Sequence, residues 1–453
     1  MALVLAAPAL LLLVNYKPIV ALMYFAALAG IGLVSLPRVT FILFFFSIAI
    51  HLSYVRNNIA IQVFDILLII LFFAVALDFL LRGRLEIRAT GLDLAFLALI
   101  AATLISALLA HNRAYSVVPT IRIILIYISF RMVYKFALEM GVRRITLLYI
   151  YLVMVLALIN ITIFIIAGGK ARVFGPAWLA FETYTMTALP MALGFMIWGR
   201  STGERLKFAA VASIIGFGLL ASQSRGPLLA VIIAVPLLLF FAYRKARRER
   251  SASSLRIIRL VFIPIVVVVA AVLLLRQSLF EGSLERLESL LKSLKNPQET
   301  VLLRLVLAKA AIKGFLAHPI FGVGIGNFKI IDQVVPEMRM EPVWFYIRGM
   351  SAHNVILHYL AETGIAGTVA LVSVSWVGLR TAYRTFRRHL ADADQQVSAA
   401  LFVGMLVFCF TLLYMRAWTW GQGGYIMAIL FGLSAAWYHH TDPSQDKSSS
   451  SNA

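Results

Sequence analysis

The stretch LLASQSRGPLLAVII, residues 219–233, places an arginine in a short polar gap between two apolar runs. The gap extends only from Ser222 to Pro227, and the guanidinium of Arg225 carries a permanent charge. Apolar runs recur along the whole chain, many of them long enough to cross about 30 Å of hydrocarbon. The role of Arg225 therefore depends on which face of a membrane the gap occupies.

The composition is that of a membrane protein. Of the 453 residues, 62% are hydrophobic and 13% charged, and the mean hydropathy is +0.92. A soluble domain is about half apolar and about a quarter charged. A β-barrel would require alternating segments of about ten residues, which are absent. The single cysteine, Cys409, lies in an apolar run, which excludes a disulfide framework and a thiol metal site. We predict an all-α polytopic membrane protein.

Hydropathy predicts about twelve, and up to fourteen, membrane-spanning helices. The first apolar segment is short, so the earliest segments are expected to merge or to form a hairpin. The N-terminus lacks a basic leader and a cleavage site, which favours a membrane segment over a signal peptide. The apolar segments are 3–14, 19–36, 39–55, 59–81, 92–110, 116–138, 145–167, 178–199, 206–222, 226–243, 258–275, 353–379, 397–414 and 423–438.

The formal net charge of +21 arises largely from basic clusters between apolar segments. In a membrane protein such clusters mark cytoplasmic loops, so the charge does not indicate a nucleic-acid partner. Counting spans places all of the clusters on one face, together with the polar C-terminal tail. They lie at Arg82–Arg88, Arg143–Arg144, Arg200–Lys207, Arg244–Arg259 and Arg380–His389.

Four regions follow from this layout. Residues 1–275 form the N-terminal spans, 276–352 one large helical loop on the non-cytoplasmic face, 353–438 the last three spans, and 439–453 a disordered cytoplasmic tail. Within the loop, leucines at helical spacing predict an amphipathic helix over residues 283–296. A second helix is predicted from Thr300 to His318, ending before Pro319.

Five arginines are predicted on the non-cytoplasmic face, where topology alone disfavours basic residues. A guanidinium suits phosphate because it donates two parallel hydrogen bonds and stays charged. Together these arginines would hold a pyrophosphate at headgroup depth. The alternative is that each reaches lipid headgroups or pairs with a carboxylate. The tight turn around Arg225 favours a functional role there. The five are Arg172, Arg225, Arg304, Arg348 and Arg416.

The stretch HPIFGVGIGNF, residues 318–328, contains the alternating glycines Gly322, Gly324 and Gly326. Their spacing does not match a dinucleotide-binding fingerprint, and no strand precedes them. We predict a compact turn that brings the backbone close to a neighbouring element. His318 is interpreted as a helix-end residue.

The stretch SAHNVILHYLAETGIAGTVA, residues 351–370, begins where the large loop returns to the membrane. His353 is predicted in the first turn of a helix, followed by Asn354. Histidine exchanges protons near neutral pH, so His353 is a candidate for proton transfer, the alternative being a structural role. His358 lies five residues on and shares a face with it poorly. Because H-E-x-x-H and a close carboxylate–histidine cluster are absent, we predict no metal site.

Three motifs in this order carry a resemblance to a known family. They are the SRG turn at Ser224–Gly226, the arginine followed by HP-x-FGVG-x-GNF in the large loop, and HN-x-x-L-x-x-L-x-E-x-G-x-x-G from His353. The sequence resembles the O-antigen ligase and polymerase superfamily of bacterial envelope enzymes over about 221–370. Its size and single large loop are most similar to the lipopolysaccharide O-antigen ligases.

The resemblance implies a glycosyltransferase with a GT-C-like fold in the bacterial inner membrane, facing the periplasm. Its donor is a glycan on undecaprenyl pyrophosphate, its acceptor is lipid A–core, and no metal or other cofactor takes part. The essential residues of the family correspond to Arg225, Arg304 and His353. We add Arg172 and Arg416 from topology, and Arg348 and Asn354, as substrate-binding residues. Attack opposite the leaving group predicts inversion at the anomeric carbon.

Three rival functions stay open. An O-antigen polymerase uses the same donor with a second lipid-linked glycan, and a protein O-oligosaccharyltransferase uses a protein acceptor. A lipid-linked sugar flippase is expected to carry charges deep within its spans. The few candidates for such charges are Asp65, Asp78, Arg122 and Arg131, whereas the candidate site gathers on one face, which favours an enzyme.

Overall fold

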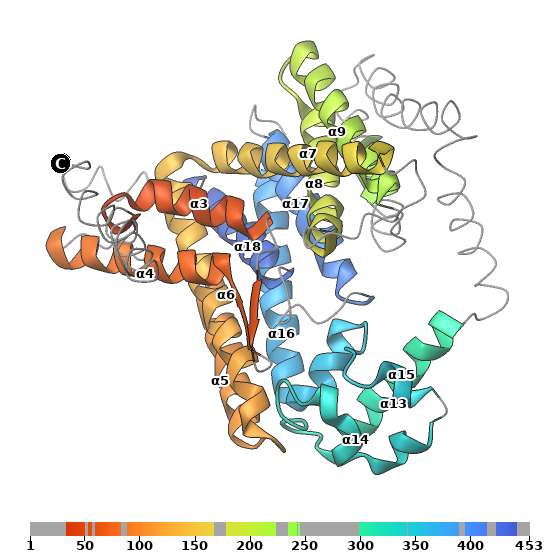
Figure 1. Cartoon of the computed structure of the whole chain (residues 1–453). Coiled ribbons are helices and arrows are strands. Elements are labelled where there is room, and N and C mark those ends of the chain that lie inside the picture. Colours follow the sequence, from red (N-terminus) through yellow and green to blue (C-terminus); the bar gives the residue numbers. More distant parts are fainter. Residues whose placement is uncertain are drawn as a thin grey trace, which may run out of the picture. The chain divides into compact units, whose positions relative to one another are not determined.

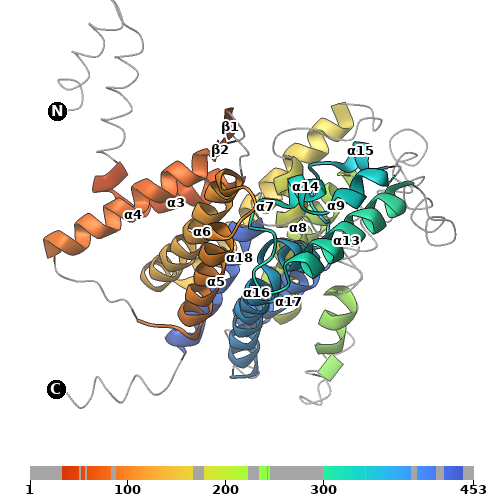
Figure 2. The ribbon, with the colours of Figure 1, turned by 90° about the horizontal axis from the view of Figure 1, so that it is seen from below.

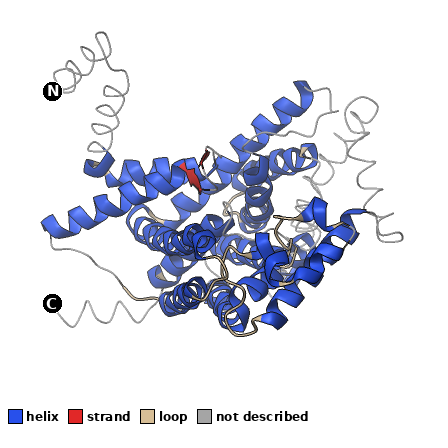
Figure 3. Ribbon diagram, turned by 60° about the horizontal axis from the view of Figure 1, so that its bottom comes forward, coloured by secondary structure: helices blue, strands red, loops and turns tan. Residues whose placement is uncertain are grey.

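The structure, a computed structural model, describes residues 33–49, 53–56, 59–82, 88–166, 178–222, 234–241, 243–244, 299–341, 343–388, 395–414 and 423–441. Helices dominate these residues (Figure 3). The chain divides into two compact units, Met1–Arg88 and Ala89–Ala453.

The described residues of the first unit form two helices and one hairpin. Helix α3 (Pro37–Ala49) packs against α4 (Val63–Arg82), and between them β1 (Ser53–Arg56) pairs antiparallel with β2 (Ile59–Gln62). The Asp65 carboxylate accepts the Gln62 backbone N–H at 3.1 Å and so anchors the start of α4. The two strands overlap the end of the predicted apolar segment 39–55 and the start of 59–81, so apart from this short hairpin the predicted all-α class is confirmed for the described residues.

The second unit contains a bundle of long helices. In Figure 2, α5, α6, α16 and α18 run side by side, and each neighbouring pair is in contact. Helix α17 packs against α8, which also contacts α9. The helices are α5 (Gly91–Leu108), α6 (Arg113–Met140), α7 (Val142–Ile166), α8 (Trp178–Trp198), α9 (Thr202–Ala221), α16 (Val355–Arg388), α17 (Gln395–Thr411) and α18 (Gly423–His440).

Among the described residues, five stretches are long and apolar enough to cross a membrane. Each coincides with a predicted apolar segment, and their outward side chains are apolar because lipid, not water, surrounds a span. A multi-pass helical membrane protein is therefore confirmed. The predicted total of about twelve spans includes residues outside those described. The five are Val63–Leu81, Gly91–Leu108, Arg113–Met140, Val142–Ile166 and Val355–Arg388.

Several basic clusters meet at one end of the bundle, which we call the basic end. Arg143, at the start of α7, pairs with Glu204, near the start of α9, at 2.6 Å. Arg388, at the end of α16, donates to the Tyr438 hydroxyl near the end of α18 at 3.1 Å. The rings of Trp198 and Phe386 bring the end of α8 to the end of α16. This grouping agrees with the orientation that the basic clusters predict.

Charges within the bundle are locally paired. Arg131 lies 3.0 Å from Asp93, which also accepts a hydrogen bond from the Tyr127 hydroxyl. Asp93 accepts the Thr90 backbone N–H as well, and this bond closes the N-terminal cap of α5. The Arg131 charge therefore stabilises a helix end.

Residues 299–352 pack beside one half of α16 (Figure 1). Their core joins α13 to the short helices through Leu307, Ile331, Met338 and Trp344. The predicted helix over 300–318 is confirmed by α13, whereas the predicted helix over 283–296 lies outside the described residues. The elements are α13 (Glu299–Ala317), η1 (Phe328–Ile330), α14 (Ile331–Val334), η2 (Pro336–Met340) and α15 (Trp344–Ile347).

Candidate active site

Helix α16 is interrupted at Gly364, where φ is 61° and ψ is −160°. A break leaves backbone groups without helical partners, and in a membrane protein they must be satisfied within the protein. The carbonyl of Pro319 accepts the Ile365 N–H at 2.9 Å, and the carbonyl of Glu362 accepts the Gly324 N–H at 3.0 Å. Residues 318–328, here called the motif loop, therefore supply partners on both sides of the break.

This fit depends on glycine. A Cβ at Gly322 would lie 2.3 Å from the Glu362 carbonyl carbon, and one at Gly364 would lie 2.4 Å from the Ile320 carbonyl carbon. Gly324 and Gly326 meet the α5–α6 connection equally closely, at Ala110 and at the Tyr115 carbonyl. All four glycines have positive φ. The prediction of a compact turn for close backbone approach is confirmed.

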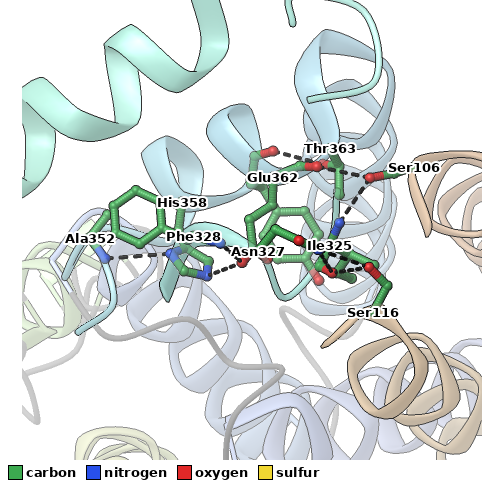
Figure 4. Close-up of polar contacts among 10 residues, drawn as sticks. Ser106, Ser116, Ile325, Asn327, Phe328, Ala352, His358, Glu362 and Thr363 are labelled. Carbon is green, nitrogen blue, oxygen red and sulfur yellow. Dashed lines mark hydrogen bonds and ion pairs between the residues drawn. The ribbon is translucent and has the colours of Figure 1, made fainter. Parts of the chain in front are cut away.

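The motif loop is also tied to the connection between α5 and α6. The Ser106 hydroxyl donates to the Glu362 carbonyl at 2.8 Å and accepts the Ile325 N–H at 3.0 Å. The Ser116 hydroxyl donates to the Ile325 carbonyl at 2.6 Å, and the Asn327 amide donates to Ser116 at 3.0 Å. Three segments distant in sequence therefore share one buried hydrogen-bond network (Figure 4).

A buried histidine and a buried glutamate lie at the centre of this network. The Nε2 of His358 is 3.4 Å from the Oε1 of Glu362, and both side chains are almost fully enclosed. The same Oε1 accepts the Phe328 N–H at 3.0 Å (Figure 4). Because Nδ1 of His358 accepts the Ala352 N–H at 3.4 Å, the ring proton is on Nε2, facing the carboxylate.

The expectation that no carboxylate lies close to a histidine was therefore wrong. Its signal was the i, i+4 spacing of His358 and Glu362, which puts both side chains on one helix face. Within the described residues, no group of three or more His, Cys, Asp or Glu side chains is placed to hold a metal ion.

His353 has a strained backbone. Its φ of 52° makes it the one non-glycine residue with positive φ among the described residues. Such a conformation costs about 1–2 kcal/mol for an L-residue and is frequently found at functional sites. The prediction that His353 lies in the first turn of a helix was wrong, because α16 begins at Val355. The Leu412 carbonyl accepts the Val355 N–H at 2.8 Å, so His353 lies close to the end of α17.

Asn354 has a local structural role. Its side-chain oxygen accepts the Leu357 N–H at 2.9 Å and caps the first turn of α16. The predicted contact of Asn354 with substrate stays a prediction.

The arginines of the large loop have different surroundings. Arg304 is exposed on α13, next to Leu303, which packs on the loop core. Arg348 is also exposed, and its Nε lies 3.5 Å from the buried carboxylate of Asp332, which Arg339 approaches at 3.4 Å. Pairing with a carboxylate is the alternative that the sequence left open for Arg348.

Arg172, Arg225 and Arg416 lie outside the described residues. The end of α9 at Ala221, four residues before Arg225, is held by the amide of Asn160 on α7, which donates to the Gly218 carbonyl at 2.9 Å. The described residues before Arg416 end at Tyr414, just after Leu412, which binds the start of α16.

Lys329 is a cation that the sequence reasoning missed. Its ammonium lies 3.8 Å from the centre of the Tyr115 ring, beside the motif loop. Burial lowers the pKa of Lys329, and the nearby charge of Glu362 acts in the opposite direction. Lys329 adds a basic group to the end of the bundle that carries His353.

Comparison with known proteins finds a match to the segment that contains the motif loop and the break in α16. The family model described as O-antigen ligase matches residues 208–372. The match supports membership of the O-antigen ligase/polymerase superfamily. The matched segment includes most of α9, all of α13, the motif loop, His353 and the break in α16. A search of curated proteins found no match.

Proposed function

We propose that the protein is an O-antigen ligase that transfers a finished O-polysaccharide from undecaprenyl pyrophosphate to lipid A–core. The superfamily supports a glycosyltransferase-type function of the ligase or polymerase kind. The observation that supports placing the proposed reaction at one site is the strained backbone of His353. This residue lies inside the matched segment, beside the buried hydrogen-bond network. Strain of this kind persists only where surrounding contacts impose it.

In the proposed reaction, His353 accepts the proton of the acceptor hydroxyl while that oxygen attacks the anomeric carbon of the donor. The new C–O bond forms as the bond from the anomeric carbon to the pyrophosphate oxygen breaks. The electron pair leaves with undecaprenyl pyrophosphate, and attack from the opposite face inverts the carbon. The donor bond supplies the energy, so the proposed mechanism uses no nucleotide, metal or other cofactor.

The arginines are assigned to the leaving group. Arg225 and Arg304 bind the pyrophosphate and stabilise the charge that develops on it. Arg172 and Arg416 extend the same positive surface. Arg348 would contribute to it by leaving its ion pair with Asp332 and binding the pyrophosphate instead.

We place the protein in the bacterial inner membrane with the basic end in the cytoplasm, as the positive-inside rule favours. The candidate site then faces the periplasm. The polyprenyl chain of the donor and the acyl chains of the acceptor lie in apolar grooves between the spans. The proposed total is about twelve spans.

The ligase assignment is tested by complementation. Wild type, His353→Ala and His318→Ala are expressed in a ligase-deficient strain that still makes O-antigen, and lipopolysaccharide is separated on a gel. Wild type and His318→Ala are expected to restore long chains on lipid A–core, and His353→Ala to leave bare core. His318 is a suitable control because it is an exposed histidine of the same loop.

Each alternative gives a different result. If wild type is present in the membrane but leaves the core bare, the ligase assignment fails for that acceptor. Rescue of a polymerase-deficient strain would then identify an O-antigen polymerase, and glycosylation of a co-expressed pilin a protein O-oligosaccharyltransferase. Activity of His353→Ala equal to wild type would remove His353 from the mechanism.

The role of Arg225 is tested with lysine. An ammonium keeps the charge but cannot donate two parallel hydrogen bonds to one phosphate. We expect Arg225→Lys to lower ligation at least about tenfold, measured as the fraction of capped core at equal protein level. Full activity of Arg225→Lys would contradict bidentate pyrophosphate binding.

A further inference from the structure

Helix α13 has two apolar faces. One face, which includes Leu307, Ala310 and Ala311, is buried in the loop core. The other carries Leu302, Leu305, Ile312 and Leu316, here called the outer stripe, whose spacing of three, seven and four residues keeps them on one side of the helix. Leu305 is 59% exposed and Leu316 is 68% exposed. Two lysines, Lys309 and Lys313, lie among these apolar residues on the same side.

The depth of α13 follows from its hydrogen bonds to α16. Immediately after α13, the carbonyls of Pro319 and Ile320 accept the N–H groups of Ile365 and Ala366. From Ile365 to the basic end at Arg388, α16 is long enough to cross about 30 Å of hydrocarbon at about 1.5 Å per residue. The break at Gly364 therefore lies near the opposite boundary of the hydrocarbon, and the C-terminal end of α13 lies there too.

The end of the neighbouring span α5 indicates the same membrane depth for the C-terminal end of α13. The end of α5 is bonded to the motif loop, since the His111 N–H donates to the Val323 carbonyl at 3.1 Å. Leu108 and Leu109, at that end, are 66% and 62% exposed, as expected for residues that face lipid. Leu316, the last residue of the outer stripe, is two residues before the motif loop and therefore lies close to this level.

We propose that α13 lies in the boundary layer of the membrane, with the outer stripe in contact with lipid acyl chains. Lys309, which lies between Leu305 and Ile312 and pairs with Glu341, extends its ammonium toward the headgroups. An apolar helix face with flanking basic residues is typical of helices that bind at the interface. The large loop is then a membrane-bound element and not a water-surrounded domain.

This placement has a consequence for Arg304, which rests on the proposed function. Arg304 lies on α13 between Leu302 and Leu305, so a membrane-bound α13 holds its guanidinium at headgroup depth. A pyrophosphate attached to a lipid tail lies at the same depth.

The test uses the fact that the chain has a single cysteine, Cys409. In a Cys409→Ser background, Leu305→Cys and Leu316→Cys are labelled with the fluorophore NBD and reconstituted in phosphatidylcholine–phosphatidylglycerol vesicles. Glu337→Cys is the matched control, because Glu337 is an acidic side chain of the same loop with 70% exposure. Quenching is measured with a phosphatidylcholine carrying a doxyl group near the start of its acyl chain, and separately with iodide in the water.

We expect doxyl lipid to quench both leucine-site probes at least about threefold more than the Glu337 probe, with blue-shifted emission. Quenching by iodide but not by doxyl lipid would show water around α13 and overturn the proposal. Protection from both quenchers would show that protein, another segment or a second copy, covers the outer stripe, and would overturn it equally. Because fluorescence is read without substrate, failure of the ligase assay does not affect this result.

Discussion

Gly322→Ala is expected to leave almost no folded protein in the membrane. The Cβ of alanine would lie 2.3 Å from the carbonyl carbon of Glu362 and 2.5 Å from the backbone nitrogen of Thr363. These are backbone atoms of α16, so no side-chain rotation relieves the overlap. The φ of 71° adds a smaller penalty. Together we expect a loss of about 4 kcal/mol or more in the free energy of unfolding.

Gly349→Ala is the matched control. Gly349 also has positive φ, 84°, but a Cβ there would meet no atom within 4 Å. Gly349→Ala should therefore lower the free energy of unfolding by only about 1 kcal/mol, because alanine disfavours positive φ. Membrane protein levels and the melting temperature in detergent measure both variants. Equal melting temperatures would show that the motif loop is not packed against the break in α16 as described.

Glu362→Leu is expected to lower the free energy of unfolding by about 3 kcal/mol, because it removes the acceptor of a buried donor and the carboxylate beside a buried histidine. The donor is the Phe328 N–H, 3.0 Å from the carboxylate, and the histidine is His358, whose Nε2 lies 3.4 Å from the same oxygen. The backbone of Glu362 still binds Ser106 and Gly324, so the loss reports the side chain alone. Glu362→Gln keeps an oxygen for the Phe328 N–H and should lose about 1 kcal/mol.

Glu139→Leu provides the comparison for this variant. Glu139 forms an i, i+4 pair with Lys135 on α6, and both side chains are about one third exposed. Removing a solvent-screened pair changes stability by less than about 1 kcal/mol. The melting temperatures of Glu362→Leu, Glu362→Gln and Glu139→Leu are measured in the same detergent. If Glu362→Leu melted at the same temperature as Glu139→Leu, the buried pair would have no special importance for the fold.

The span positions were predictable because hydropathy is a local property of the chain. Lipid requires a continuous apolar surface and an internally satisfied backbone, and all five spans except Val355–Arg388, which is broken at Gly364, meet this requirement within their own residues. The end of α13 before Pro319 and the glycines of the motif loop were also local signals, since proline cannot continue a helix and glycine permits positive φ. The motifs around Arg225, Arg304 and His353 led to the superfamily whose model matches residues 208–372.

The internal arrangement of the site was not predictable in the same way. The contact of Ser106 with Glu362 joins residues 256 positions apart, and no local pattern indicates which polar groups will meet. The break in α16 was missed because its sequence around Gly364 reads as one apolar helix, and the motif loop that satisfies the broken backbone comes from elsewhere in the chain.

His353 shows the same division. Its type and position near a membrane boundary made it a candidate from sequence, but its left-handed backbone follows from contacts made by its neighbours. His358 holds the Ala352 N–H on one side, and Leu412 holds the Val355 N–H on the other. Hydropathy and local backbone preference are enough to place helices in a membrane, whereas strain, buried pairs and the exposed second face of α13 exist only once distant segments have packed together.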